Sequence, residues 1–63
     1  MIPRNIVENL INISVYIYIK DIAEQFSGII KEITEDELVV LEDKYNNLTY
    51  IPISEINVIT ERR

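Results

Sequence analysis

The stretch FSGII at residues 26–30 decides the fold, because it places the chain's only glycine inside a β-strand pattern. Glycine weakens a strand unless the strand bends sharply or another backbone comes close, so Gly28 predicts a bend. In a regular strand, Ile29 and Ile33 share the face opposite Ile30, and both faces are then apolar. We therefore expect a strand that belongs to both sides of a small, strongly bent β-barrel.

The flanking sequence carries four further strand patterns. Residues 14–20 have a period of two, with isoleucine and valine on one face and tyrosine and lysine on the other. Residues 38–41 are apolar throughout, which is typical of a strand buried on both faces. Residues 48–51 and 56–59 supply the last two strands, and Pro52 between them stops ladder pairing.

A short helix is predicted before the first strand. Pro3 suits a first helical turn, and Ile6, Val7, Leu10 and Ile11 recur at the spacing of one helix face. This pattern predicts a helix of about eight to ten residues, a length that is marginal in isolation and needs a surface to lie on. We expect the helix to cover one end of the barrel.

The shortness of the chain limits its stability. A protein of 63 residues buries only about 60% of the surface that its unfolded chain exposes. Small domains usually compensate with disulfides, a structural metal or oligomerisation, and this sequence contains no cysteine and no histidine. It also contains no repeat, linker or low-complexity segment. We therefore expect residues 1–63 to form one mainly β domain that assembles into a homo-oligomer.

The composition also narrows the function. Without Cys or His there is no thiol nucleophile, imidazole base or usual zinc ligand, so we expect no catalytic residue, metal site or cofactor. The acidic run at residues 35–37 is interpreted as a solvated turn. A net charge of −5 disfavours general binding to nucleic acid, and nothing indicates DNA. No apolar run approaches the length of a membrane span, and we expect a cytoplasmic protein.

Four segments carry a resemblance to a known family: VYIYI at residues 15–19, FSGII at 26–30, LVVLED at 38–43 and YIPISEI at 50–56. Together they resemble the Sm-like small β-barrels, in their first strand, glycine-bent second strand, third strand ending in Asp, and corner between the last two strands. Other SH3-like barrels share such a pattern. The resemblance covers about residues 6–59 and implies a helix followed by a five-stranded, strongly bent antiparallel barrel.

Sm-like proteins form rings in which the fourth strand of one subunit pairs with the fifth strand of the next. The resemblance thus implies a ring contact through residues 48–53 and 56–59. The side chains expected at this contact are Leu48, Tyr50, Ile51, Ile53, Ile56 and Val58. The chain departs from the family at its RNA-binding motifs, because only Asp36 and Tyr50 match them.

The sequence is compatible with two functions. In the first, an Sm-like ring binds single-stranded RNA at its pore or rim, since tyrosine rings stack on bases and cations hold phosphates. The residues expected to do so are Tyr16, Tyr18, Lys20, Lys31, Tyr50, Arg62 and Arg63. In the second, an SH3-like adaptor binds protein and no nucleic acid, and the tyrosines cover an outer face or interface. Binding that weakens with salt favours the first function.

Overall fold

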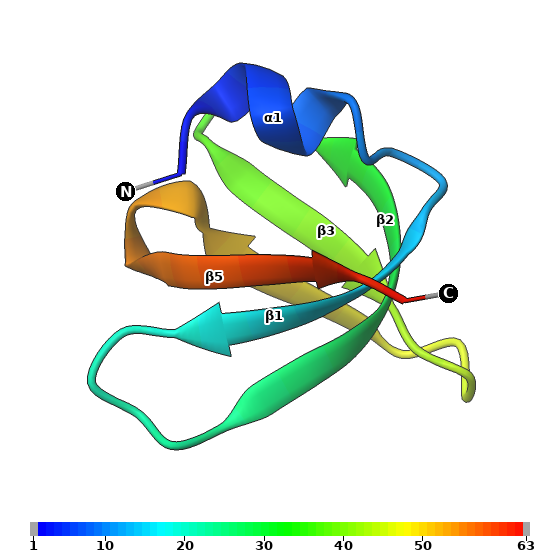
Figure 1. The fold of residues 1–63 in the computed structure, drawn as a ribbon. Coiled ribbons are helices and arrows are strands. Elements are labelled where there is room, and N and C mark those ends of the chain that lie inside the picture. The colour runs from blue at the N-terminus through cyan, green and yellow to red at the C-terminus, as the bar shows by residue number, and fades with distance from the viewer. Residues whose placement is uncertain (1, 63) are drawn as a thin grey trace.

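The computed structural model describes residues 2–62, and its elements follow the order that the sequence predicts (Figure 1). One short helix precedes five strands, and a 3-10 turn separates the last two strands. The elements are α1 (Arg4–Glu8), β1 (Ser14–Ile19), β2 (Gln25–Ile33), β3 (Leu38–Glu42), β4 (Leu48–Pro52), η1 (Ile53–Glu55) and β5 (Ile56–Glu61). All four neighbouring pairs of strands are antiparallel, so the mainly β class is confirmed.

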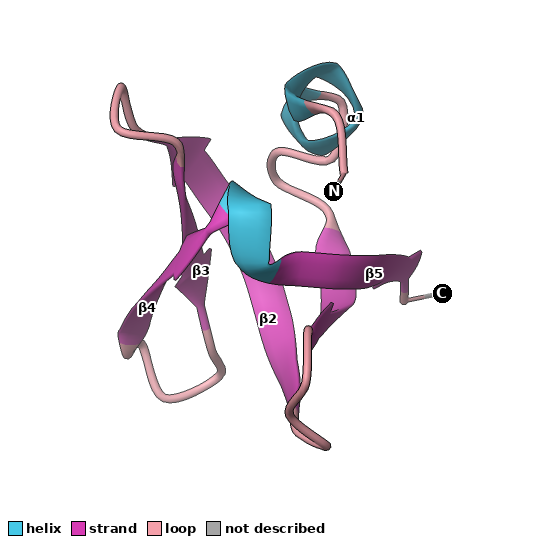
Figure 2. Ribbon diagram, turned by 90° about the vertical axis from the view of Figure 1, so that its left-hand side faces the viewer, coloured by secondary structure: helices cyan, strands magenta, loops and turns pink. Residues whose placement is uncertain are grey.

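The strands form one sheet in the order β4-β3-β2-β1-β5. Figure 2 shows that this sheet folds into two limbs, with β3 and β4 on one side, β5 on the other, and β2 passing between them. The short turn η1 joins the limbs at a corner and directs β5 away from β4. Within residues 2–62 the outer edges of β4 and β5 pair with no strand. The predicted bending is confirmed, but the barrel is corrected to a bent sheet that stays open.

Gly28 allows the bend. Its φ of 155° lies in a region that residues with side chains rarely adopt, and a Cβ at this position would lie 2.5 Å from the carbonyl oxygen of Glu42. No other residue type tolerates such a close backbone approach. β2 accordingly pairs with β1 through its first half, as far as Ile29, and with β3 from Ile29 onward.

A β-bulge places Ile33 differently from the sequence pattern. The register between β2 and β3 shifts between Ile30 and Glu32, so an extra residue interrupts the alternation. Ile33 therefore pairs with the buried Val39 and packs against the same core as Ile30. Ile29 remains exposed. The expectation that Ile29 and Ile33 share a face is wrong, because it assumes an uninterrupted two-residue alternation and the bulge breaks that alternation.

The core lies inside the bend and is aliphatic. Alternate residues of β1 and β3 point into it, α1 contributes Val7, and η1 contributes Ile53. Its buried members are Val7, Leu10, Val15, Ile17, Ile30, Val39, Leu41, Ile51, Ile53 and Ile56. Val40 is buried as well, on the opposite face of β3, which confirms a strand covered on both faces. Among residues 2–62 no polar or charged residue is buried, so apolar packing holds the interior together.

The helix α1 covers one end of the sheet, as expected, but it is only five residues long (Figure 1). After Glu8 the chain tightens into turns, in which the N–H of Leu10 donates to the Val7 carbonyl. Asn12 then adopts a left-handed φ of 71° and donates its N–H to the Ile30 carbonyl. The predicted length of eight to ten residues is wrong, because this left-handed residue turns the chain into β1.

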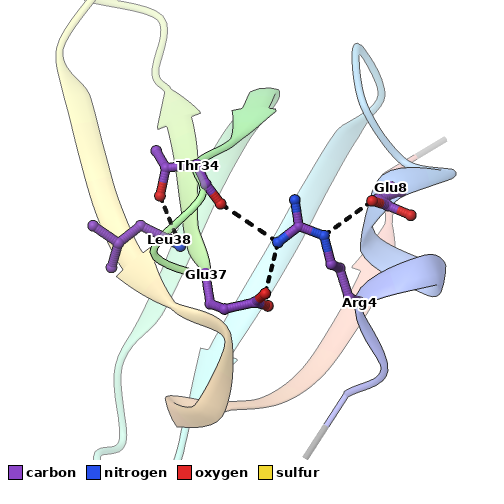
Figure 3. A network of polar contacts seen from close by, with 5 residues as sticks. All are labelled: Arg4, Glu8, Thr34, Glu37 and Leu38. Carbon is purple, nitrogen blue, oxygen red and sulfur yellow. Dashed lines mark hydrogen bonds and ion pairs between the residues drawn. The ribbon is translucent and has the colours of Figure 1, made fainter.

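Arg4 fastens α1 to the turn between β2 and β3 (Figure 3). Its Nε lies 3.0 Å from Oε2 of Glu8, and its Nη1 lies 2.8 Å from Oε1 of Glu37. Nη1 also donates to the carbonyl oxygen of Thr34 at 3.4 Å. The hydrogen bond to Glu8, followed by the charge of Glu37, raises the pKa of Arg4 above its ordinary value. Glu37, which belongs to the acidic run, thus helps to orient the helix.

Candidate functional site

The outer edges of β4 and β5 are the first candidate for function. Exposed apolar side chains lie beside both edges: Leu48 is 49% and Tyr50 is 56% exposed on β4, and Val58 is 44% exposed on β5. A strand edge with unpaired backbone groups is a template for pairing with another chain, and apolar side chains strengthen that tendency. Each edge can therefore accept a strand from a second molecule.

The alternation of ladder hydrogen bonds along β4 shows which of its backbone N–H and C=O groups face outward. Ile53 donates its N–H to the Glu37 carbonyl, on the β3 side, and antiparallel ladder bonds recur at every second residue. The odd-numbered residues of β4 therefore face β3, and the N–H groups of Leu48 and Tyr50 point away from the sheet. Pro52 belongs to the same outward set, where its missing N–H costs the sheet nothing. Pairing with β3 therefore continues through Pro52 to Ile53, and the expectation that Pro52 stops the ladder is wrong. Proline also limits how far a partner strand can pair.

The same alternation shows which backbone groups of β5 face outward. The N–H of Arg62 donates to the Ser14 carbonyl at 2.8 Å, so the even-numbered residues from 58 onward face β1. Ile59 consequently directs its backbone groups outward. Val58 lies opposite Tyr18 on the outer face of the sheet, and these two side chains form a partly exposed apolar strip along the edge.

Three of the six side chains expected at a ring contact are accessible to a partner, namely Leu48, Tyr50 and Val58. The other three, Ile51, Ile53 and Ile56, are buried in the chain's own core. Alternation along β4 explains the burial of Ile51, because every second side chain of an edge strand faces inward. Ile53 belongs to η1 and Ile56 begins β5. The buried isoleucines position the edges, and the three exposed residues lie at the surface beside them.

A pocket of about 520 Å³ opens where β2 diverges from β3. We call it the bend pocket. It is lined by Tyr16, Gln25, Phe26, Ser27, Gly28, Leu41, Asp43, Lys44, Tyr45, Thr49 and Arg62. β2 begins to pair with β3 only at Ile29, so its first half leaves a gap beside the turn that follows β3. The bend at Gly28 thus produces the pocket as well as the curvature of the sheet.

Two cations lie over tyrosine rings at the bend pocket. Cζ of Arg62 lies 5.7 Å from the centroid of the Tyr16 ring, and Nζ of Lys44 lies 5.2 Å from the centroid of the Tyr45 ring. Both distances fall within the range of cation–π attraction. β1 and the end of β5 supply the first pair, and the turn between β3 and β4 supplies the second. Aromatic faces and positive charge therefore occur together in a chain whose net charge is negative.

Asp43 shapes the turn that carries Lys44 and Tyr45. Its Oδ1 accepts the backbone N–H of Asn47 at 3.0 Å and that of Tyr45 at 2.8 Å. The hydrogen bond from Asn47, followed by that from Tyr45, lowers the pKa of Asp43 below its ordinary value of 3.8. Asn46 adopts a left-handed φ of 66°, a conformation that asparagine tolerates in turns. The carboxylate is engaged by the backbone and holds the turn that brings Lys44 and Tyr45 to the pocket.

The residues expected to bind RNA do not form one patch. Tyr16 and Arg62 meet at the bend pocket, whereas Tyr18 lies on the outer face beside Val58. Nζ of Lys31 lies 3.7 Å from Oε1 of Glu42, and Lys31 does not line that pocket. Lys20 and Tyr50 line a different groove, and Arg63 lies outside the described residues. The set of residues expected to bind RNA leaves out Lys44 and Tyr45, although an adjacent cation and aromatic residue in a turn are visible in the sequence.

A second, mainly apolar groove of about 340 Å³ runs beside β4, and we call it the edge groove. It is lined by Ile19, Lys20, Asp21, Ile22, Phe26, Thr49, Tyr50, Ile51, Pro52 and Glu55. The loop between β1 and β2 forms one wall and β4 forms the other. A strand that paired with β4 could therefore rest a side chain in this groove.

No protein-family model, curated protein or solved structure matches this chain. Within residues 2–62, no group of acidic side chains is arranged to hold a metal ion. The described part of the chain also has no helix with the length and apolar character needed to cross a membrane. The strand edges, the bend pocket and the edge groove are therefore the features from which function is inferred.

Proposed function

We propose that the protein is a non-catalytic, Sm-like binding module whose subunits assemble by pairing β4 of one chain with β5 of the next. The observation that supports this proposal is that the outer edges of β4 and β5 pair with no strand of residues 2–62 and lie beside exposed apolar side chains. Two different surfaces meet in such a contact. Repeating it forms a closed ring when the rotation between neighbouring subunits brings the last subunit back to the first. Assembly also buries surface that a chain of 63 residues cannot bury alone.

Single-stranded RNA is the ligand that we propose for this assembly. The bend pocket combines tyrosine rings, which stack on unpaired bases, with cations, which attract phosphates. An assembly repeats the pocket once per subunit, so one RNA strand can contact several subunits and gain avidity. This arrangement supplies a binding surface without the RNA-binding motifs of Sm-like proteins.

A second candidate function is binding of a protein segment along β4. The edge groove supports it, because its wall is mainly apolar and borders an unpaired edge. An extended peptide can add a strand to such an edge and place alternate side chains in a groove. Self-assembly through β4 and capture of another protein through β4 exclude one another at any one subunit.

The oligomeric state tests the assembly. Light scattering on the eluting protein should give a multiple of the chain's mass at micromolar concentration. The double variant Leu48→Lys/Tyr50→Lys and the variant Val58→Lys should both be monomeric, because each places charge beside an edge that must be buried. Ile6→Lys is the matched control, since Ile6 is an exposed isoleucine on α1, away from both edges. A monomeric wild type contradicts the proposal.

Mixing the two variants tests whether unlike edges meet. The Leu48→Lys/Tyr50→Lys chain keeps an intact β5, and the Val58→Lys chain keeps an intact β4. Together they should form a dimer and nothing larger, since each mixed pair has one intact contact and one damaged contact. Failure of the mixture to dimerise would show that the contact uses another surface.

Filter binding on short RNA homopolymers separates the two ligands. RNA binding should fall steeply as salt rises, because released counterions drive it. Binding of a protein segment in the edge groove should tolerate salt and should be lost in the Tyr50→Lys variant. Absence of RNA binding by the assembled wild type at low salt would eliminate RNA and leave the second candidate.

A further inference from the structure

We propose that the bend pocket binds one nucleotide of a single-stranded RNA, with the base against the tyrosine rings and the phosphate between Lys44 and Arg62. This inference rests on the proposed RNA function and assigns it to one place in the fold. The place is the corner between the end of β5 and the turn after β3. It lies within a single chain and is distinct from the outer edges of β4 and β5.

The size and lining of the pocket fit a nucleotide. A volume of about 520 Å³ falls within the range of small-molecule sites, which is roughly 300 to 1,000 Å³. Phe26 and Leu41 supply apolar surface deep in the bend, and Gln25, Ser27 and Thr49 supply groups that donate and accept hydrogen bonds. An apolar wall with a few polar groups is the usual composition of a ligand site. The polar groups suit the edge of a base.

Tyr45 is the expected stacking platform. Its side chain is 72% exposed, so one face of the ring is open to a base while Lys44 covers part of the ring. Tyr16 is less exposed and has Arg62 over its ring, which makes it a wall of the pocket. Base stacking on aromatic side chains does not depend strongly on base identity. The pocket should therefore accept adenine and uracil alike.

The two cations are available for phosphate because neither is held in an ion pair within residues 2–62, although the Asp43 carboxylate also lines the pocket and attracts Lys44. The Asp43 carboxylate accepts two backbone N–H groups, and Glu42 lies 3.7 Å from Lys31. Neither Lys44 nor Arg62 forms an ion pair in the described structure; each lies over a tyrosine ring instead. A phosphate can replace or share those contacts at little cost, since surface cation–π contacts are weak.

The test measures binding of fluorescently labelled oligo(A) and oligo(U), and of AMP and inorganic pyrophosphate as competitors. Tyr45→Leu should weaken RNA binding roughly tenfold, since loss of one stacked base weakens binding by about fivefold or more. Arg62→Gln should reduce the slope of log K against log salt by about 0.7, the value expected for one phosphate contact on a single strand. Tyr18→Leu and Lys20→Gln are matched controls, since neither residue lines the bend pocket, and they should bind as the wild type does.

The competitors and controls make the outcomes distinct. Displacement of RNA by AMP but not by pyrophosphate supports a site that recognises base and phosphate together. RNA binding that responds to Tyr18→Leu and Lys20→Gln as strongly as to the pocket variants overturns the bend pocket and leaves RNA as the ligand. Binding of neither RNA nor AMP overturns both this inference and the proposed RNA function. Full competition by pyrophosphate overturns the role given to the tyrosine rings.

Discussion

Replacing Gly28 by alanine should destabilise this protein more than any other single-methyl addition on the sheet. The new Cβ would lie 2.5 Å from the Glu42 carbonyl oxygen, 3.0 Å from the Glu42 carbonyl carbon and 3.2 Å from Cγ of Leu41. Two of these neighbours are backbone atoms, so no rotation of a side chain relieves the overlap. The φ of 155° adds strain, because alanine rarely adopts it.

The magnitude follows from these two effects. Holding a residue in a sparsely populated backbone conformation costs about 1 to 3 kcal/mol. Forcing an extra methyl group into packed surroundings costs typically about 1 to 3 kcal/mol. The expected loss is therefore about 2 to 6 kcal/mol of the free energy of unfolding. A domain of 63 residues has roughly 3 to 9 kcal/mol in total, so Gly28→Ala should remove most of it.

Urea unfolding followed by circular dichroism measures this loss. The control is Ser27→Ala, because Ser27 is exposed on the same strand and its substitution adds no atom. Ser27→Ala should leave the midpoint within the equivalent of about 0.5 kcal/mol of the wild type. The reasoning is refuted if Gly28→Ala unfolds at the same urea concentration as Ser27→Ala, since the bend would then tolerate a side chain.

Two further predictions concern charged groups. The lowered pKa of Asp43 means that its ionised form contributes stability above pH 3.8 and that this contribution is lost as the pH falls through the lower, folded-state pKa. Asp43→Asn keeps an oxygen acceptor for the turn but has no titrating carboxylate. The stability of this variant should therefore depend less on pH below 3.8 than that of the wild type or of the control Asp36→Asn. The same loss of stability with falling pH in all three proteins would contradict this. Glu37→Gln should speed amide exchange of Val7 and Leu10, because Arg4 loses a partner at 2.8 Å. Glu35→Gln, in the same turn, should leave that exchange unchanged, and equal exchange in both variants would show that Arg4 does not hold the helix.

The strands were predictable because their pattern is local. The alternation from Val15 to Ile19 and the apolar run that ends at Leu41 each define a strand by themselves, and burial follows those patterns. Gly28 predicted the bend because glycine is unfavourable inside a strand unless the strand bends or another backbone comes close. The helix length and the face of Ile33 were not predictable in this way. A left-handed turn and a bulge set them, and both depend on contacts with distant strands.

The candidate site was only partly predictable. Tyr16 and Arg62 are 46 positions apart in the sequence (62 minus 16), and only the pairing of β1 with β5 brings them together. Lys44 and Tyr45 join them because β2 turns away from β3, which no local pattern shows. At the edge strands, alternation distinguished the exposed Tyr50 from the buried Ile51 in principle. The resemblance to a family of rings nevertheless assigned both residues to the contact.

One backbone position links the fold to the proposed site. Gly28 lets the backbone of β3 approach β2 at Glu42, and the chain beyond Glu42 then diverges into the turn that carries Lys44 and Tyr45. Any side chain at Gly28 that pushes β3 outward must therefore also move that turn relative to Tyr16 and Arg62. The pocket is thus a consequence of the bend, whereas the outer edges of β4 and β5 depend on the buried isoleucines behind them. For this reason, assembly and nucleotide binding should respond to different substitutions, although one small core supports both.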